Sequence, residues 1–173
     1  MATHPAPNSE RVDTSRYELV QGKLIERAVP GFTHSSLQER ITQLIRLKVS
    51  ADGKIVRSEF SLDKDENPGS DWLTPDALVS KNEGFRLKEA NEHALPPVFL
   101  AVEVLSTGQS FMTMRWKADQ YLNWGVEHVW FLDPESRAVL TFDSRDRGRA
   151  QLISEGIVSV PDELSLALSE IFK

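Results

Sequence analysis

Residues 98–132 read VFLAVEVLSTGQSFMTMRWKADQYLNWGVEHVWFL, and this stretch decides the fold. It begins with the apolar run Val98–Leu105 and ends with a second run, Val129–Leu132, and both are typical of buried strands. Between them, residues 111–124 repeat apolar side chains at helical spacing, and Gly125 is a good helix terminator. A helix between two such strands implies a parallel pair with a right-handed crossover. We therefore expect an α/β protein with a mixed β-sheet core flanked by helices.

The N-terminal third predicts a hairpin followed by a helix. Residues 17–26 alternate like two short strands around Gln21-Gly22, which indicates an N-terminal β-hairpin. Ser36 followed by Glu39 matches a capping box, and helical spacing then continues to about residue 50.

The remaining segments add strands on either side of the central unit. Residues 54–62 and 75–80 predict strands, whereas residues 82–97 are charged and predict an irregular surface excursion. Residues 138–154 predict a C-terminal β-hairpin extension around a turn at 146–148.

One acid lies where an apolar side chain is expected. Glu103 interrupts the run Val98–Leu105, and an unpaired carboxylate there would cost several kcal/mol or be forced neutral. Asp76 follows Pro75 at the point where a strand should start. A cation should therefore face Glu103: a divalent metal, a lysine or both.

Helical spacing suggests which lysine this is. Met114, Lys117, Ala118 and Tyr121 fall on one face of the expected helix, and the other members of that face are apolar. Lys117 should thus pack toward the sheet with its ammonium near the neighbouring acids. The alternative is that its side chain extends along the surface to solvent.

Length and composition fit a soluble domain. The 173 residues are 40% hydrophobic and 27% charged, and we expect a disordered tail at 1–13 and a single domain at 14–173. The net charge of −6 counts against a general nucleic-acid binder. There is no cysteine, and the four histidines lack metal-ligand spacing. No apolar run approaches a membrane span and no secretion signal is visible, so we expect a cytoplasmic protein.

Several segments match a known family in order and spacing: Tyr17–Glu26, His34 near a helix start, Pro75-Asp76, Val102–Ser106, Lys117–Tyr121 and Gly125–Pro134. Together they resemble the Uma-two family of restriction-endonuclease-like proteins, within the PD-(D/E)XK nuclease superfamily. The resemblance covers about residues 16 to 143. It implies a restriction-endonuclease-like fold and metal-dependent hydrolysis of DNA phosphodiester bonds, with Mg²⁺ or Mn²⁺ as cofactor.

The resemblance also implies roles for individual residues. Asp76 and Glu103 match the metal-binding acids of the superfamily, and the backbone carbonyl of Val104 would be a further ligand. Glu18 and His34 match positions that recur in the family.

This chain departs from the pattern at a few positions. Where the superfamily has a lysine two residues after the glutamate, this chain has Leu105, and the family pattern suggests that Lys117 on the helix takes its place. Thr107 stands where a proline is common, and Gln109 and Thr113 replace an aspartate.

Three functions are compatible with these features. The first is a Mg²⁺-dependent DNA endonuclease, expected to be a homodimer because paired sites commonly cut the two strands. The second is a non-catalytic nucleic-acid-binding protein with the same fold. The third is a protein-interaction module in which Asp76, Glu103 and Lys117 form only a buried ionic cluster.

Overall fold

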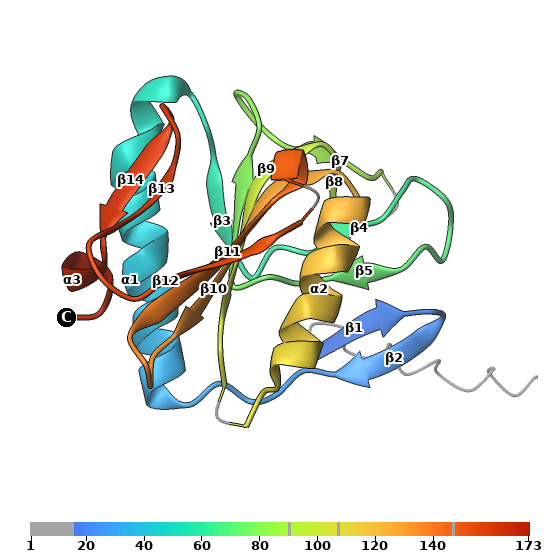
Figure 1. Cartoon of the computed structure of the whole chain (residues 1–173). Helices are drawn as coiled ribbons and strands as arrows, with labels where there is room; N and C mark the ends of the chain where they lie inside the picture. Colours follow the sequence, from blue (N-terminus) through green and yellow to red (C-terminus); the bar gives the residue numbers. More distant parts are fainter. Residues whose placement is uncertain (1–15, 90, 107, 147) are drawn as a thin grey trace, which may run out of the picture.

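The computed structural model describes residues 16–89, 91–106, 108–146 and 148–173 (Figure 1). The predicted disordered tail at 1–13 and Thr107 lie outside these residues. In chain order the elements are β1 (Tyr17–Val20), β2 (Lys23–Glu26), α1 (Phe32–Val49), η2 (Ser50–Asp52), β3 (Val56–Ser58), β4 (Leu62–Asp63), β5 (Trp72–Leu73), β6 (Ala77–Ser80), β7 (Arg86–Leu87), β8 (Ala94–Leu95), β9 (Val98–Val104), α2 (Phe111–Asn123), β10 (Val126–Asp133), β11 (Ala138–Asp143), η3 (Ser144–Asp146), β12 (Ala150–Ile153), β13 (Ile157–Val160), β14 (Leu164–Ala167) and α3 (Leu168–Ile171).

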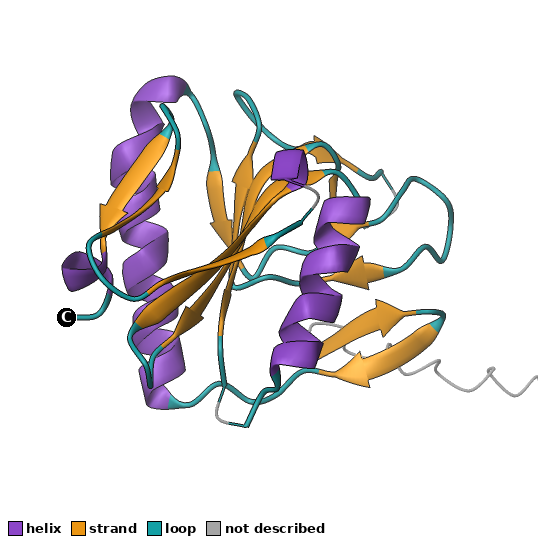
Figure 2. Cartoon of the chain, in the orientation of Figure 1, coloured by secondary structure: helices purple, strands orange, loops and turns teal. Residues whose placement is uncertain are grey.

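The central sheet has the strand order β12-β11-β10-β9-β6-β3. Its middle pair, β9 and β10, is parallel and is joined through α2, while the other pairs are antiparallel. Helices α1 and α2 lie on opposite faces of this sheet (Figure 2). The predicted mixed sheet flanked by helices is therefore confirmed. Gly125 ends α2 with a φ of 93°, a conformation that favours glycine.

The alternation of side chains along β9 sets the direction of Glu103. Val102 and Val104 pack in the apolar cluster under α1. Ala101 packs in the cluster under α2, together with Leu105 just beyond the strand. Because successive strand residues face opposite sides, Glu103 points toward α2.

A second sheet has the order β2-β1-β5-β4-β8-β7. The predicted N-terminal hairpin forms its edge, with Gln21 and Gly22 both at positive φ in the turn. The prediction of an irregular excursion at 82–97 is wrong in part, because two short strands, β7 and β8, lie within it. Two-residue strands are too short to show a period in the sequence.

The C-terminal region also differs in detail from the prediction. The hairpin β11–β12 forms as predicted, but β11 pairs with β10, so the hairpin continues the central sheet. A further hairpin, β13–β14, and the short helix α3 pack against α1 and were not predicted. No helix in the described part of the chain combines the length and hydropathy that a membrane crossing requires.

Candidate active site

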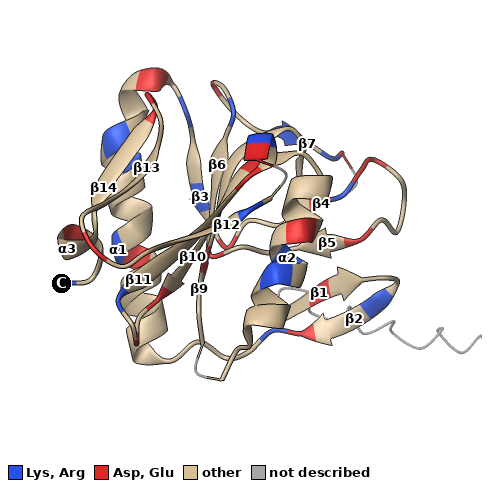
Figure 3. Cartoon of the chain, in the orientation of Figure 1, with Lys and Arg blue, Asp and Glu red and all other residues tan. Residues whose placement is uncertain are grey.

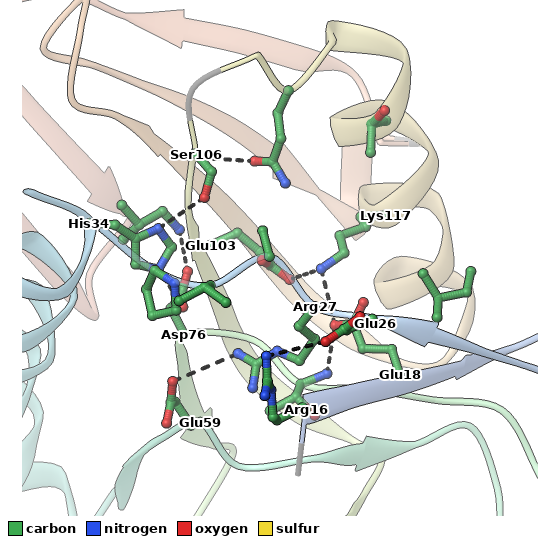
Figure 4. Close-up of a pocket in the computed structure, with 18 of the residues that line it drawn as sticks. Arg16, Glu18, Glu26, Arg27, His34, Glu59, Asp76, Glu103, Ser106 and Lys117 are labelled. Atoms are coloured by element: carbon green, nitrogen blue, oxygen red, sulfur yellow. Dashed lines mark hydrogen bonds and ion pairs between the residues drawn. The ribbon is translucent and has the colours of Figure 1, made fainter. Parts of the chain in front are cut away.

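Four elements bring charged side chains to one end of the central sheet. Ala77 of β6 pairs with Val102 of β9, so the antiparallel register places Asp76 opposite Glu103. Lys117 approaches from α2 and Glu18 from β1. Figure 4 shows these side chains gathered in one pocket.

Glu103 is held by two donors from the same helix. Its Oε1 accepts a hydrogen bond from Lys117 Nζ at 3.0 Å and one from the Tyr121 hydroxyl at 2.5 Å. Lys117 and Tyr121 are four residues apart, one turn of α2, so they meet the same carboxylate. Glu103 is buried, with 8% of the residue exposed, and the described residues donate no hydrogen bond to its Oε2. Oε2 is thus available to another ligand.

Lys117 bridges two acids. Its Nζ lies 3.1 Å from Glu18 Oε1 as well as 3.0 Å from Glu103 Oε1. Glu18 is fixed in turn by the backbone N–H of Thr74, which donates to the same Oε1 at 3.0 Å. The lysine therefore packs toward the sheet rather than extending to solvent.

Asp76 is tied to both the sheet and α1. Its Oδ2 accepts the backbone N–H of Val104 at 2.6 Å, and its Oδ1 lies 3.0 Å from His34 Nε2. His34 is in the first turn of α1, and its other ring nitrogen lies 3.4 Å from the Ser106 hydroxyl. Both carboxylate oxygens of Asp76 thus have a partner, unlike those of Glu103.

Burial and charge shift the pKa values of this group. Burial, together with the nearby charges of Asp76 and Glu18, raises the pKa of Glu103 to about 7, despite the opposing effect of Lys117. Burial alone would lower the pKa of Lys117, but the charges of Glu103 and Glu18 outweigh it and hold that pKa above its ordinary value. The hydrogen bond to Asp76 raises the pKa of His34. Near neutral pH, then, Lys117 is a cation and Glu103 lies close to its titration point.

The site includes residues that the sequence did not identify as functional. Tyr121 was placed on the Lys117 face, but its hydroxyl contact with Glu103 depends on how α2 docks on β9. Arg16 and Arg27 line the same pocket, where they pair with Glu26 and Glu59. In the sequence, the only indication that these two arginines belong to the site was their position beside the predicted hairpin.

The pocket has a volume of about 950 Å³, within the range of ligand-binding cavities. The residues that line it come from the β1–β2 hairpin, the start of α1 and the segment before it, the residues after β3 and β5, the start of β6, the end of β9 with the loop after it, and the first turns of α2. They are Arg16, Glu18, Val20, Gln21, Ile25, Glu26, Arg27, Ala28, Val29, Pro30, His34, Glu59, Thr74, Asp76, Glu103, Val104, Ser106, Gln109, Thr113, Trp116 and Lys117.

The donor set is compatible with Mg²⁺ but not with a metal held by protein alone. Among the described residues, no group of three or more His, Cys, Asp or Glu side chains is placed to hold an ion. Mg²⁺ typically binds one or two carboxylates and takes its other ligands from water and substrate phosphate. Asp76 and Glu103 would be the carboxylates of such a site, and Oε2 of Glu103 has no hydrogen-bond donor among the described residues.

The fold and the site define a restriction-endonuclease-like α/β protein, and the comparisons with known proteins agree. Residues 7–171 match the Uma2 family, described as "Putative restriction endonuclease", and the chain belongs to this family. The resemblance to the Uma-two family is thus confirmed.

A solved structure supports the fold. It is described as that of "a putative nuclease belonging to DUF820 from Anabaena variabilis ATCC 29413", and it is similar to this chain with a TM-score of 0.75 and 23% identity, over 90% of this chain and 89% of that one. At this level of identity the similarity shows the fold alone. No curated protein matches the chain.

Proposed function

We propose that this chain is a metal-dependent endonuclease that hydrolyses phosphodiester bonds of DNA. The observation that carries the proposal is the juxtaposition of Asp76, Glu103 and Lys117, with Lys117 Nζ 3.0 Å from Glu103, in a member of a nuclease-like family. Asp76 and Glu103 would bind Mg²⁺, or Mn²⁺ in its place. DNA is the proposed partner, and the cytoplasm is the proposed location.

The metal would be held at the end of the central sheet where β6 begins and β9 ends. When bound, Mg²⁺ supplies charge neutralisation at the phosphate and an activated water. The Val104 N–H points toward Asp76, and in an extended strand the carbonyl of a residue leaves on the same edge as its N–H. This direction supports the Val104 carbonyl as a further ligand.

Lys117 would take the place of the motif lysine. Leu105 lies on the same face of β9 as Glu103 but packs in the apolar cluster under α2. Lys117 brings its ammonium to that face from the helix instead, and a charged ammonium there would stabilise negative charge that develops on the phosphate. Glu18 would hold the Lys117 side chain in this position, and the Tyr121 hydroxyl would hold that of Glu103.

His34 would act through Asp76. Its Nε2 lies 3.0 Å from Oδ1, and with the Val104 N–H on Oδ2 it fixes the carboxylate plane. We therefore propose a positioning role for His34, with Ser106 steadying its other nitrogen.

The charge balance of the pocket supports a requirement for metal. Five carboxylates line it against three permanent cations: Glu18, Glu26, Glu59, Asp76 and Glu103 against Arg16, Arg27 and Lys117. A phosphate would be repelled by this excess unless a divalent cation accompanied it.

Metal binding can be tested directly. Calorimetric titration with Mn²⁺ should give binding to the unmodified chain and none to Glu103→Gln or Asp76→Asn. Glu59→Gln is the matched control, because Glu59 lines the same pocket but pairs with Arg27 rather than Lys117. Undiminished binding in the Glu103 and Asp76 variants would contradict the proposed site.

The homodimer expected from the sequence stays a prediction. Light scattering on the purified chain measures it, and a mass near the 19.5 kDa of one chain would contradict it.

A further inference from the structure

We infer that two copies of this chain pair edge to edge through strand β12 and so join their central sheets into one antiparallel sheet across a two-fold axis. The inference names the surface of the homodimer expected from the sequence, and it does not depend on the nuclease activity. β12 ends the strand order of the central sheet, so no described strand pairs with its outer side. The outer backbone N–H and C=O groups of such a strand are able to pair with another chain.

Among the described strands, β12 is the one edge strand of the two six-stranded sheets that carries no charged residue. At the other three edges, β3 contains Arg57, β2 contains Lys23 and Glu26, and β7 contains Arg86. Charged side chains on an edge strand hinder its pairing with another chain. β12 has the sequence AQLI, and Figure 3 shows it without Lys, Arg, Asp or Glu. The chain thus protects three edges and leaves this one open.

β12 also exposes an apolar side chain that continues the core. Leu152 lies opposite Leu140 of β11, and Leu140 packs at the margin of the apolar cluster under α2. Leu152 therefore faces the same side of the sheet, yet it is 65% exposed because nothing among the described residues covers it. A second chain that paired with β12 would bury it.

One register makes β12 complementary to itself. Antiparallel pairing centred on Leu152 sets this leucine opposite its own copy, because a two-fold axis relates identical residues. Arg149 and Glu155 are each three positions from Leu152, so the arginine of one copy lies opposite the glutamate of the other. Opposite charges at directly paired positions stabilise an antiparallel pair. Centring the pair on Gln151 or Ile153 loses this match.

Both charges are free to form such pairs. Arg149 and Glu155 are exposed, and neither takes part in an ion pair with the described residues. The two-fold axis would form the Arg149–Glu155 pair twice, once at each end of the joined strands. Charge complementarity therefore favours a second copy of this chain as the partner.

The proposed interface is separate from the pocket. β11 and β10 lie between β12 and β9 in the central sheet, and no residue of β11 or β12 lines the pocket. Changes in β12 should thus leave Mn²⁺ binding intact, so that failure of the dimer and failure of the proposed function are distinguishable.

Sedimentation equilibrium at increasing protein concentration tests the inference. The mass of the unmodified chain should rise toward twice the 19.5 kDa of one chain. Leu152→Lys sets two ammonium groups opposite each other and should keep the chain monomeric at every concentration. The matched control is Leu87→Lys, because Leu87 is an exposed leucine in β7, an edge strand of the other sheet, and dimerisation should be unchanged. Calorimetric titration with Mn²⁺ should give equal binding in all three proteins.

Exchange of the two charges tests the register. Arg149→Glu alone sets glutamates opposite each other and should weaken dimerisation by about tenfold. The double variant Arg149→Glu/Glu155→Arg restores opposite charges and should restore the dimer. A monomer at every concentration of the unmodified chain would overturn the inference, as would a dimer that persists in Leu152→Lys. Failure of the double variant to dimerise would contradict the register, and loss of the dimer in Leu87→Lys would assign the contact to the second sheet.

Discussion

At the scale of single residues, the site depends on how Glu103 is kept in a buried strand. Burial alone favours its neutral form, whereas Lys117 and the Tyr121 hydroxyl favour the carboxylate, and the balance raises its pKa to about 7. The outcome is an acid that gives up its proton near neutral pH, as a metal ligand must. Because its pKa is raised in the folded state, ionisation of Glu103 without a bound metal lowers the free energy of unfolding.

This cost predicts a pH dependence of stability. Between about pH 4.5 and pH 7 the folded state binds more protons at Glu103 than the unfolded chain, so the free energy of unfolding should fall as pH rises through that window. His34, whose pKa is also raised, contributes in the same direction. Thermal denaturation in EDTA measures this at several pH values. Between about pH 5 and pH 8 the free energy of unfolding should fall less for Glu103→Gln than for the unmodified chain. Parallel curves for the two proteins would contradict the shift.

Tyr121→Phe tests the hydroxyl contact. The change keeps the ring in the core but removes a hydrogen bond to Glu103, which is ionised above its pKa of about 7. The free energy of unfolding should therefore fall by about 1.5–3 kcal/mol at about pH 8. Urea denaturation measures it. The same change at Tyr17, the other tyrosine of the chain and only partly buried, is the control and should have little effect. Equal losses in both variants would show that the Glu103 contact contributes nothing particular.

The sequence predicted part of this site because two of its signals are local. Glu103 is conspicuous in an apolar run, and the phase of α2 turns Lys117 toward it. The contact between His34 and Asp76 joins residues 42 positions apart. Such contacts follow from how α1 closes over the sheet, so spacing along the chain could not reveal them.

At the scale of elements, α1 begins one turn earlier than its local capping sequence predicts. The capping box at Ser36 and Glu39 predicted the helix start, but α1 begins at Phe32 after Gly31, which provides no side-chain cap. Leu37 and Ile41 are buried against the sheet, and this packing is compatible with one more turn before them. The extra turn carries His34 to Asp76.

The loop between β4 and β5 depends on a buried ionic cluster. Asp63 Oδ2 accepts one hydrogen bond from Lys88 Nζ at 2.5 Å, and Asp63 Oδ1 lies 2.6 Å from His93 Nδ1. Asp63→Ala would leave Lys88 buried without its acid, so the free energy of unfolding should fall by about 3–5 kcal/mol. Glu66→Ala breaks the exposed pair with Arg86 and should cost at most about 1 kcal/mol. Similar denaturation midpoints for the two variants would contradict a stabilising role for the cluster.

At the scale of the whole molecule, the fold could be predicted mainly from the strand–helix–strand unit β9–α2–β10. Its long apolar strands have a clear pattern, and they form the centre of the main sheet. β4, β5, β7 and β8 of the second sheet have two residues each, which is too few to show a period. β13 and β14 do alternate apolar and polar side chains in part, but their place against α1 depends on tertiary packing. These short elements form because of their packing against the rest of the fold, and the local sequence does not reveal that packing.

Metal bound at the proposed site should stabilise the folded chain as a whole. Mn²⁺ that binds only the folded chain raises its stability by about 2.7 kcal/mol at a hundredfold excess over Kd. Differential scanning calorimetry should therefore show a higher Tm with Mn²⁺ than with EDTA for the unmodified chain and no change for Asp76→Asn. The same rise in the variant would place the ion elsewhere.

In the proposed function, Asp76, Glu103 and Lys117 act with a divalent cation in the hydrolysis of phosphodiester bonds. The most direct measurement is cleavage of labelled DNA, offered as single strand and as duplex, by the unmodified chain and by Glu103→Gln, in Mg²⁺ and in EDTA. Cleavage should occur only with the unmodified chain and only in Mg²⁺. Cleavage that persists in Glu103→Gln or in EDTA, or no cleavage of either DNA under any condition, would contradict it.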